Sequence, residues 1–169
     1  MTRSAAREIA VHCSYSLGFS RQTPDEFLEE RMEKENFLRW GEENSLYQEY
    51  PNEKQVEYIR EVVRGVAEHG FELDSYIAQY SKNWTFERIP RMAAAIMRVA
   101  MYEILYMPAI PNAAAINDAV EITKKYEDEK VVSFVNGILG TFVRTEFPEE
   151  SQPKVQAPFP ASSGNIGSS

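Results

Sequence analysis

The chain has 169 residues, of which 43% are hydrophobic, and its formal charge is −8. This length suits one domain with a substantial buried core. No apolar run approaches the roughly 20 residues that a membrane-spanning helix needs, and the amino-terminal segment lacks the apolar stretch of a secretory signal. The single cysteine, Cys13, excludes an intrachain disulfide and a cysteine-built metal site. We therefore expect a cytoplasmic protein with no membrane partner.

The negative charge is concentrated in one part of the chain. Residues 25–57 hold eleven acids and four bases, a local charge of −7. Residues 1–21 instead hold three arginines and one glutamate. The overall charge disfavours a nucleic-acid partner, but the basic amino-terminal segment restores that option. The acidic segment suits either a basic protein partner or simple solubility.

Apolar residues recur at helical spacing and strand-like alternation is absent, so we predict an all-α, single-domain bundle of about seven helices. The first helix is expected over residues 3–17, where Gly18 ends it. Thr23 and Pro24 open the second as its N-cap and its first helical residue. A loop containing one short turn should then occupy residues 41–51.

The middle of the chain shows one long and two short helical patterns. A helix over residues 52–70 is predicted to stop at its last residue, a glycine. Shorter helices are predicted over residues 73–80 and 86–89. Between them, Trp84 is expected to anchor packing and Thr85 to cap the second short helix.

The most apolar segment, residues 91–107, leaves only a thin polar stripe and is therefore predicted to be the central helix. Pro111 then breaks the chain, and two helices are expected from just after it to about residue 126 and over residues 129–145. The folded domain is predicted to cover residues 1–146. Residues 147–169, rich in Pro, Ser and Gly, are predicted to form a disordered tail.

Chemistry-bearing clusters are scarce. His12 and His69 lie in different predicted helices, and neither has neighbours at metal-ligand spacing. The acids Asp118 and Glu121 are more typical of solvated charges than of acid–base catalysis. The glycines form no phosphate-binding loop. We therefore predict no catalytic residue, no metal and no cofactor, and infer that the function is binding.

Two features of the sequence bear on a binding site, and the first helix is the one that favours binding. Arg3 and Arg7 are four residues apart and are expected to project from one side of the first helix, where they either clamp a phosphate backbone or are simply solvated. Cations at a helix start oppose its dipole, which favours a functional reason. In the last predicted helix, Asn136 and Gly137 occupy interior positions, although glycine there costs about 1 kcal/mol relative to alanine. We interpret both as structural residues at the edge of the site, Asn136 to cap or bridge backbone groups and Gly137 to permit close helix approach.

Several short segments, taken in order over residues 3 to 145, resemble the bacterial transcription antitermination factor NusB. They are Ala5 to Ala10, Gly65-Val66, Trp84 with Arg88, Ile96 to Glu103, Ile110-Pro111, Ala115 to Glu121, Lys124-Lys125 and Phe134 to Gly137. The resemblance implies a non-enzymatic adaptor that binds boxA RNA. Its partner would be the small-subunit ribosomal protein that doubles as NusE, in an antitermination complex on RNA polymerase during ribosomal RNA synthesis.

The resemblance also implies RNA-binding residues. In the family an arginine-rich first helix contacts boxA RNA; Arg3 and Arg7 match that pattern, whereas Ser4 stands where other members can carry arginine. We therefore predict weak RNA binding by the isolated protein. Lys130 and Phe134 are expected to extend the RNA path, because a partly exposed phenyl ring can stack on an unpaired base, although Phe134 is equally suited to the core.

The sequence is also compatible with other functions and assemblies. A helical module that binds only a basic protein partner and has lost RNA contact fits the reduced arginine content. A homodimer in the absence of the partner is also compatible with the sequence. The related fold that precedes ribosomal RNA methyltransferase domains is disfavoured, because the chain carries no Rossmann-like glycine motif.

Overall fold

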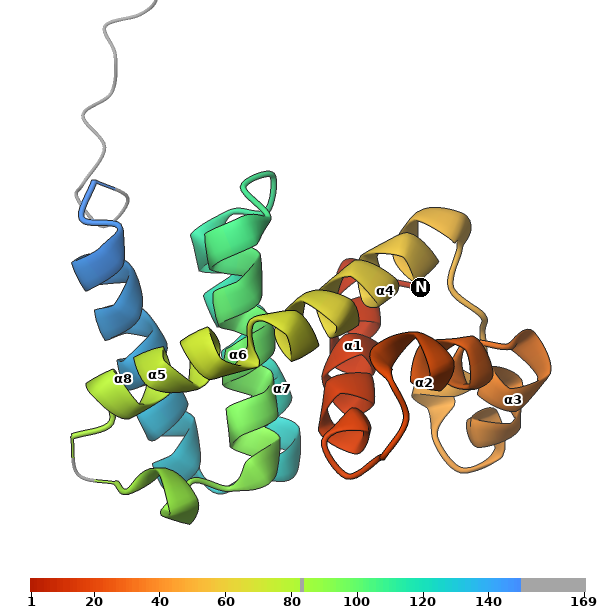
Figure 1. The fold of residues 1–169 in the computed structure, drawn as a ribbon, viewed down its shortest axis with the longest axis horizontal. Helices are drawn as coiled ribbons and strands as arrows, with labels where there is room; N and C mark the ends of the chain where they lie inside the picture. Colours follow the sequence, from red (N-terminus) through yellow and green to blue (C-terminus); the bar gives the residue numbers. More distant parts are fainter. Residues whose placement is uncertain (83, 150–169) are drawn as a thin grey trace, which may run out of the picture.

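The computed structural model describes residues 1–82 and 84–149, and every regular element in these residues is a helix (Figure 1). The prediction of an all-α fold is therefore confirmed. In chain order the elements are α1 Arg3–Leu17, α2 Pro24–Arg31, α3 Lys34–Arg39, η1 Trp40–Glu42, η2 Ser45–Tyr47, α4 Glu53–Glu68, α5 Gly70–Tyr80, η3 Phe86–Arg88, α6 Arg91–Tyr106, α7 Asn112–Tyr126 and α8 Glu129–Glu146.

Side-chain caps fix where several helices begin. The Thr23 hydroxyl accepts a hydrogen bond from the Glu26 amide (3.2 Å), and the Glu26 carboxylate accepts one from the Thr23 amide (2.9 Å), with Pro24 as the first helical residue. This capping box satisfies two amides that an uncapped helix leaves unpaired. Asn52 caps the start of α4, and Asp128 caps the start of α8. The predicted opening of α2 is confirmed.

The helix predicted over residues 52–70 stops within two residues of Gly70, but the next helix begins earlier than predicted. Helix α4 ends at Glu68, and α5 begins at Gly70 rather than at Leu73. The Leu73 amide already donates to the His69 carbonyl (2.9 Å), so helical hydrogen bonding resumes immediately after the junction. A glycine can end or begin a helix, and here nothing in the local sequence distinguishes the two.

Other local predictions also need correction. The segment after α3 contains two 3-10 turns, η1 and η2, instead of one short turn. Thr85 makes no side-chain cap at η3, whose single turn is held by the Arg88 amide donating to the Thr85 carbonyl (2.9 Å). The acidic region forms two helices, α2 and α3, and the Glu33 side chain caps the second of them. The described residues therefore contain eight α-helices.

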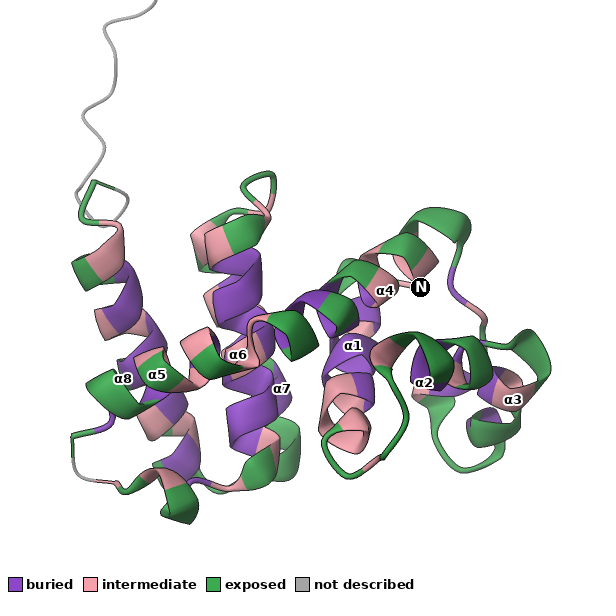
Figure 2. Cartoon of the chain, viewed as in Figure 1, coloured by how far each residue is buried: buried purple, intermediate pink, exposed green. Residues whose placement is uncertain are grey.

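Helix α6 is central, as predicted. It contacts α1, α4, α5, α7 and α8, and Figure 2 shows it buried along most of its length. Helices α4 and α5 cross one side of this group (Figure 1). Gly65 permits the close crossing of α4, because a Cβ atom there would lie only 2.1 Å from the Tyr102 ring of α6. The core therefore forms around one nearly apolar helix.

The predicted disordered tail is only partly covered by the structure. Phe147 is half-buried, and its ring lies 6.1 Å from that of Phe142 in α8, so the folded unit continues past residue 146. Residues 150–169 lie outside the described residues. Within the described part of the chain, no helix is both long enough and apolar enough to cross a membrane.

His12 joins three elements of the fold. Its Nδ1 lies 2.7 Å from the Tyr47 hydroxyl of η2, and its Nε2 lies 2.6 Å from the Tyr126 hydroxyl of α7. The Tyr126 hydroxyl donates to Glu8 (2.7 Å). In the neutral ring, Nε2–H therefore donates to Tyr126, and Nδ1 accepts from Tyr47. Neutral His12 satisfies both of these contacts.

We expect the stability of the protein to fall on acidification because of His12. Burial lowers the pKa of His12 below 6.5, and the nearby charges of Arg31 and Lys125 also lower it, although Glu8 opposes them. The folded state thus binds fewer protons than the unfolded state, and stability is complete above pH 6.5 and declines below it, at about 1.4 kcal/mol per unit of pKa difference.

Urea unfolding measured from about pH 7 to pH 5 tests this expectation. The His12→Gln variant should lose less stability over that range than the wild type. His69→Gln is the control for replacing a histidine by glutamine elsewhere in the chain. Equal slopes in wild type and His12→Gln would remove His12 as the cause.

Candidate nucleic-acid interface

The start of α1 presents two of the predicted site residues to solvent. The Thr2 hydroxyl accepts from the Ala5 amide (3.0 Å) and so fixes the first turn. Arg3 and Ser4 are exposed there. The Ser4 hydroxyl donates to Asp118 of α7 (2.8 Å), which ties the exposed end of α1 to a second helix.

Arg7 is buried, so the prediction that it projects beside Arg3 is wrong. Only 1% of Arg7 is exposed. Its Nε donates to both carboxylate oxygens of Glu103 (2.9 Å each), its Nη1 forms an ion pair with Asp118, and the Tyr58 hydroxyl donates to the same Glu103. The cause is Glu103, which is fully buried in α6 and needs a buried cation.

This Arg7 network (Ser4, Arg7, Tyr58, Glu103 and Asp118) connects α1 with α4, α6 and α7. Burial raises the pKa of Glu103, whereas the adjacent Arg7 guanidinium opposes that effect. Burial also disfavours charge on Arg7, but Glu103 and other neighbours outweigh it and raise its pKa. Among the described residues, Arg7 Nη2 has no hydrogen-bond partner. The network therefore holds the start of α1 in one position on the core.

A second cluster lies at the start of α8. Lys130, Phe134 and Gly137 are spaced at i, i+4 and i+7, so they share one side of this helix. Lys130 and Gly137 are exposed, and Phe134 is half-buried. The Phe134 ring stacks on Trp84, with centroids 4.5 Å apart and planes inclined by 29°, and Lys130 Nζ lies 5.9 Å from the Trp84 centroid. We call these four residues the α8 stripe.

Phe134 thus combines the two roles that its sequence position left open. It packs against the core beside Trp84, yet part of its surface remains accessible. Trp84 packs there as predicted. Its place beside Lys130 was not foreseen, because Trp84 is fifty positions earlier in the chain than Phe134 and no local spacing relates them.

Gly137 does not serve close helix packing. A Cβ atom at this position would meet no heavy atom within 4 Å. We expect Gly137→Ala to raise the free energy of unfolding by about 0.5 to 1 kcal/mol, because alanine favours a helix interior and meets no clash. Urea denaturation measures this gain. A loss of stability would mean that the Gly137 backbone is more constrained than its surroundings indicate.

Helix α7 connects the two exposed clusters. Asp118 holds Ser4 at the middle of α7, and Tyr126 ends the helix, three residues before α8 begins. The intervening eight residues span about 12 Å. Lys125 on this stretch binds Glu8 of α1 (2.7 Å), which keeps α1 and α7 together. Helix α7 therefore packs against both α1 and α8, the two helices that carry the exposed clusters.

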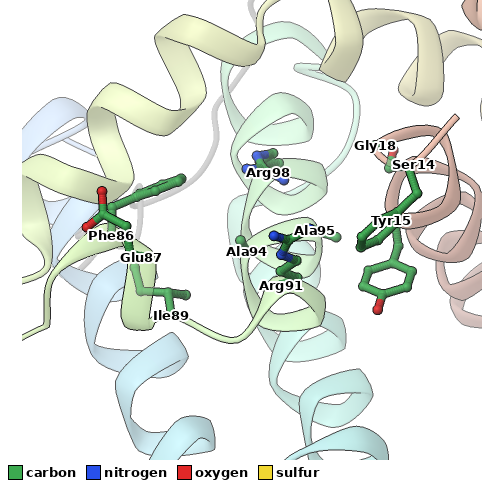
Figure 3. A pocket seen from close by; sticks show the side chains of 11 residues that line it. Ser14, Tyr15, Gly18, Phe86, Glu87, Ile89, Arg91, Ala94, Ala95 and Arg98 are labelled. Carbon is green, nitrogen blue, oxygen red and sulfur yellow. The ribbon is translucent and has the colours of Figure 1, made fainter. Parts of the chain in front are cut away.

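A further groove lies between the end of α1 and α6 (Figure 3). Its volume is about 380 Å³. Tyr15 and Ser14 come from α1, Arg91 and Arg98 from α6, and Phe86 from η3. The Oγ atom of Ser14 is buried and has no hydrogen-bond partner among the described residues. The groove therefore combines apolar rings and one unsatisfied hydroxyl with two engaged guanidinium groups, since Arg98 pairs with Asp74 (2.6 Å) and Arg91 lies over the Phe19 ring.

These features define a helical binding protein that exposes cationic and aromatic side chains. Comparison with solved structures identifies its fold. NusB of T. maritima aligns with a TM-score of 0.66 and 25% identity over 88% of this chain and 96% of that one. A solved complex of the antitermination factors NusB and NusE with double-stranded RNA aligns with a TM-score of 0.68 over 85% of this chain and 96% of that chain, at 24% identity. The fold is that of the NusB antitermination factors.

The sequence comparison makes the family explicit. The sequence model of the NusB family matches residues 4–144. The transcription antitermination protein NusB of Thermoanaerobacter sp. (strain X514) is 40% identical over 152 residues, which is 90% of this chain and 97% of that protein. The chain belongs to the NusB family of non-enzymatic transcription antitermination proteins. The resemblance stated from the short motifs is confirmed.

Proposed function

We propose that this protein acts in the cytoplasm as an RNA-binding antitermination factor that binds boxA-type single-stranded RNA together with the ribosomal protein that doubles as NusE. The pair would then join the antitermination complex on RNA polymerase. Family membership supports the process. The solved NusB–NusE–RNA complex that shares this fold supports the type of partners.

The α8 stripe carries the RNA part of the proposal. Its half-buried phenyl ring already stacks on Trp84, and Lys130 stands beside the same indole ring. Aromatic rings on a protein surface stack on unpaired bases, and an adjacent lysine can contact the phosphate backbone. A Cβ atom at Gly137 would meet no heavy atom within 4 Å, which leaves space beside this turn of the helix for a nucleotide.

The start of α1 supplies the second contact. Arg3 is the exposed guanidinium and Ser4 the exposed hydroxyl, and both suit a phosphate. We assign Arg7 a positioning role, because it is buried and holds Asp118, the acceptor of Ser4. With one guanidinium in place of two at this point, few phosphates are neutralised, which supports weak binding by the protein alone.

We assign the protein partner to the groove between α1 and α6. Aromatic rings and arginines there are typical of protein interfaces, and the groove is distinct from the α8 stripe. The unpaired hydroxyl of Ser14 would gain a partner when a chain occupies the groove. The same occupant would contribute RNA-binding surface that this acidic protein lacks.

Fluorescence anisotropy with a boxA-type single strand and a scrambled strand, with and without the ribosomal partner, tests the proposal. We expect a preference for boxA that becomes stronger with the partner and weaker with added salt. No preference under either condition, with the partner still bound, would refute the RNA half of the proposal.

A protein-binding adaptor without direct RNA contact is the second candidate. The burial of Arg7 favours it, since this leaves the first helix with less exposed positive charge than its sequence suggests. In that case the partner alone would bind RNA, and Lys130→Ala would not change the affinity of the complex. A loss of affinity in Lys130→Ala would instead support direct contact.

A further inference from the structure

A half-exposed tryptophan stands between two hollows on the α2–α3 side of the molecule. Trp40 is 51% exposed. One adjacent hollow, of about 320 Å³, is lined by Phe27, Arg31, Asn36, Arg39 and other residues beside Trp40. The other, of about 200 Å³, is also lined by Trp40, together with His12, Tyr15, Asn44, Tyr47 and other residues. An extended chain that crosses Trp40 would have space for a side chain in each hollow.

The charge around Trp40 identifies the kind of chain that would bind. Residues 24–43 contain eight acids, all exposed, and three bases. Two of the three bases are engaged: Arg39 pairs with Glu35 (3.9 Å), and Arg31 packs over the rings of Phe27 and Trp40. The surface is therefore strongly negative, which repels phosphate and attracts a cationic segment.

The Trp40 ring itself already accepts a guanidinium. Arg31 lies over it, with Cζ 5.3 Å from the ring centroid. Half of the side chain remains accessible to a further arginine or lysine. Glu42 and Glu43 follow Trp40 after one residue, Gly41, and both are exposed, so they can pair with neighbouring cations.

We propose that this Trp40 surface (Trp40, Glu42, Glu43 and the two flanking hollows) docks a basic, extended segment of a protein partner. It lies at the opposite end of the molecule's long axis from α8 (Figure 1). The site is therefore additional to the RNA surface and does not depend on RNA binding. A cationic side chain stacks on Trp40, and its neighbours pair with the two glutamates.

Anisotropy of a fluorescein-labelled arginine–lysine peptide, titrated with the full chain, tests this proposal. We expect saturable binding that weakens with salt. Trp40→Ala should weaken the binding about two- to fivefold, as exposed cation–π contacts do. The double variant Glu42→Gln/Glu43→Gln should weaken it as well. Circular dichroism confirms that each variant remains folded, which is expected because all three side chains are exposed.

The matched control removes the same number of negative charges from another helix. Glu57→Gln/Glu61→Gln on α4 alters the net charge equally and should leave peptide affinity unchanged. If both double variants weaken binding to the same extent and Trp40→Ala has no effect, the attraction is only that of an acidic protein, and the proposal fails. Preferential binding of a uridine oligonucleotide at Trp40, or self-association that Trp40→Ala abolishes, would likewise overturn it.

Discussion

Replacing Arg7 by alanine is expected to lower the free energy of unfolding by about 3 to 5 kcal/mol, because it leaves a buried carboxylate without its cation. Glu103 is fully buried, and Arg7 donates to both of its oxygens. Tyr58 and Asp118 then remain beside an uncompensated charge. Urea denaturation at neutral pH, compared between wild type and Arg7→Ala, measures the loss.

Two further variants separate the buried charge from the loss of a side chain. Arg3→Ala removes an exposed arginine one turn earlier and should change stability by no more than about 0.5 kcal/mol. The double variant Arg7→Met/Glu103→Leu removes both charges and should recover much of the loss. A cost for Arg7→Ala similar to that for Arg3→Ala would show that the Arg7 network does not stabilise the fold.

Phe134→Ala is expected to weaken RNA binding by the complex with the ribosomal partner by about 1 to 3 kcal/mol, roughly five- to 150-fold, through the loss of one base-stacking ring. The same change disturbs packing against Trp84. Phe134→Leu therefore provides the sharper test, because leucine fills much of the volume but cannot stack. Anisotropy with boxA-type RNA compares the three proteins.

Phe71→Ala is the matched control, since it removes a phenyl ring that is 90% exposed on α5. RNA affinity should not change in this variant. Wild-type affinity in both Phe134 variants would exclude stacking at the α8 stripe. An equal loss in Phe71→Ala would mean that RNA reaches another side of the molecule.

Local signals in the sequence were sufficient for most of the fold. The capping residues Thr23 and Pro24 and the nearly apolar composition of residues 91–107 each act within a few positions, and the structure follows them. The start of α5 was predicted at Leu73 instead of Gly70, because a glycine permits both the end and the beginning of a helix. Helix boundaries are therefore least predictable at residues whose local preferences are ambiguous.

The site was less predictable because its contacts join distant segments. Arg7 had the spacing of a surface residue, and its burial depends on Glu103, 96 positions later. A usable signal existed: Glu103 is a lone acid in an apolar helix, and such an acid requires a buried cation. The proximity of Trp84 to Lys130 had no comparable signal. Lys130 and Phe134 came from the family resemblance and remain proposals as RNA contacts.

The salt dependence of boxA RNA binding tests the central claim that the start of α1 and the α8 stripe contact the same RNA. In complex with the ribosomal partner, Arg3→Ala and Lys130→Ala should each reduce the slope of log affinity against log salt by about 0.7, and the double variant by about 1.4. Lys34→Ala, on the distant α3, should leave the slope unchanged. Unchanged slopes in all variants would contradict direct RNA contact by this protein.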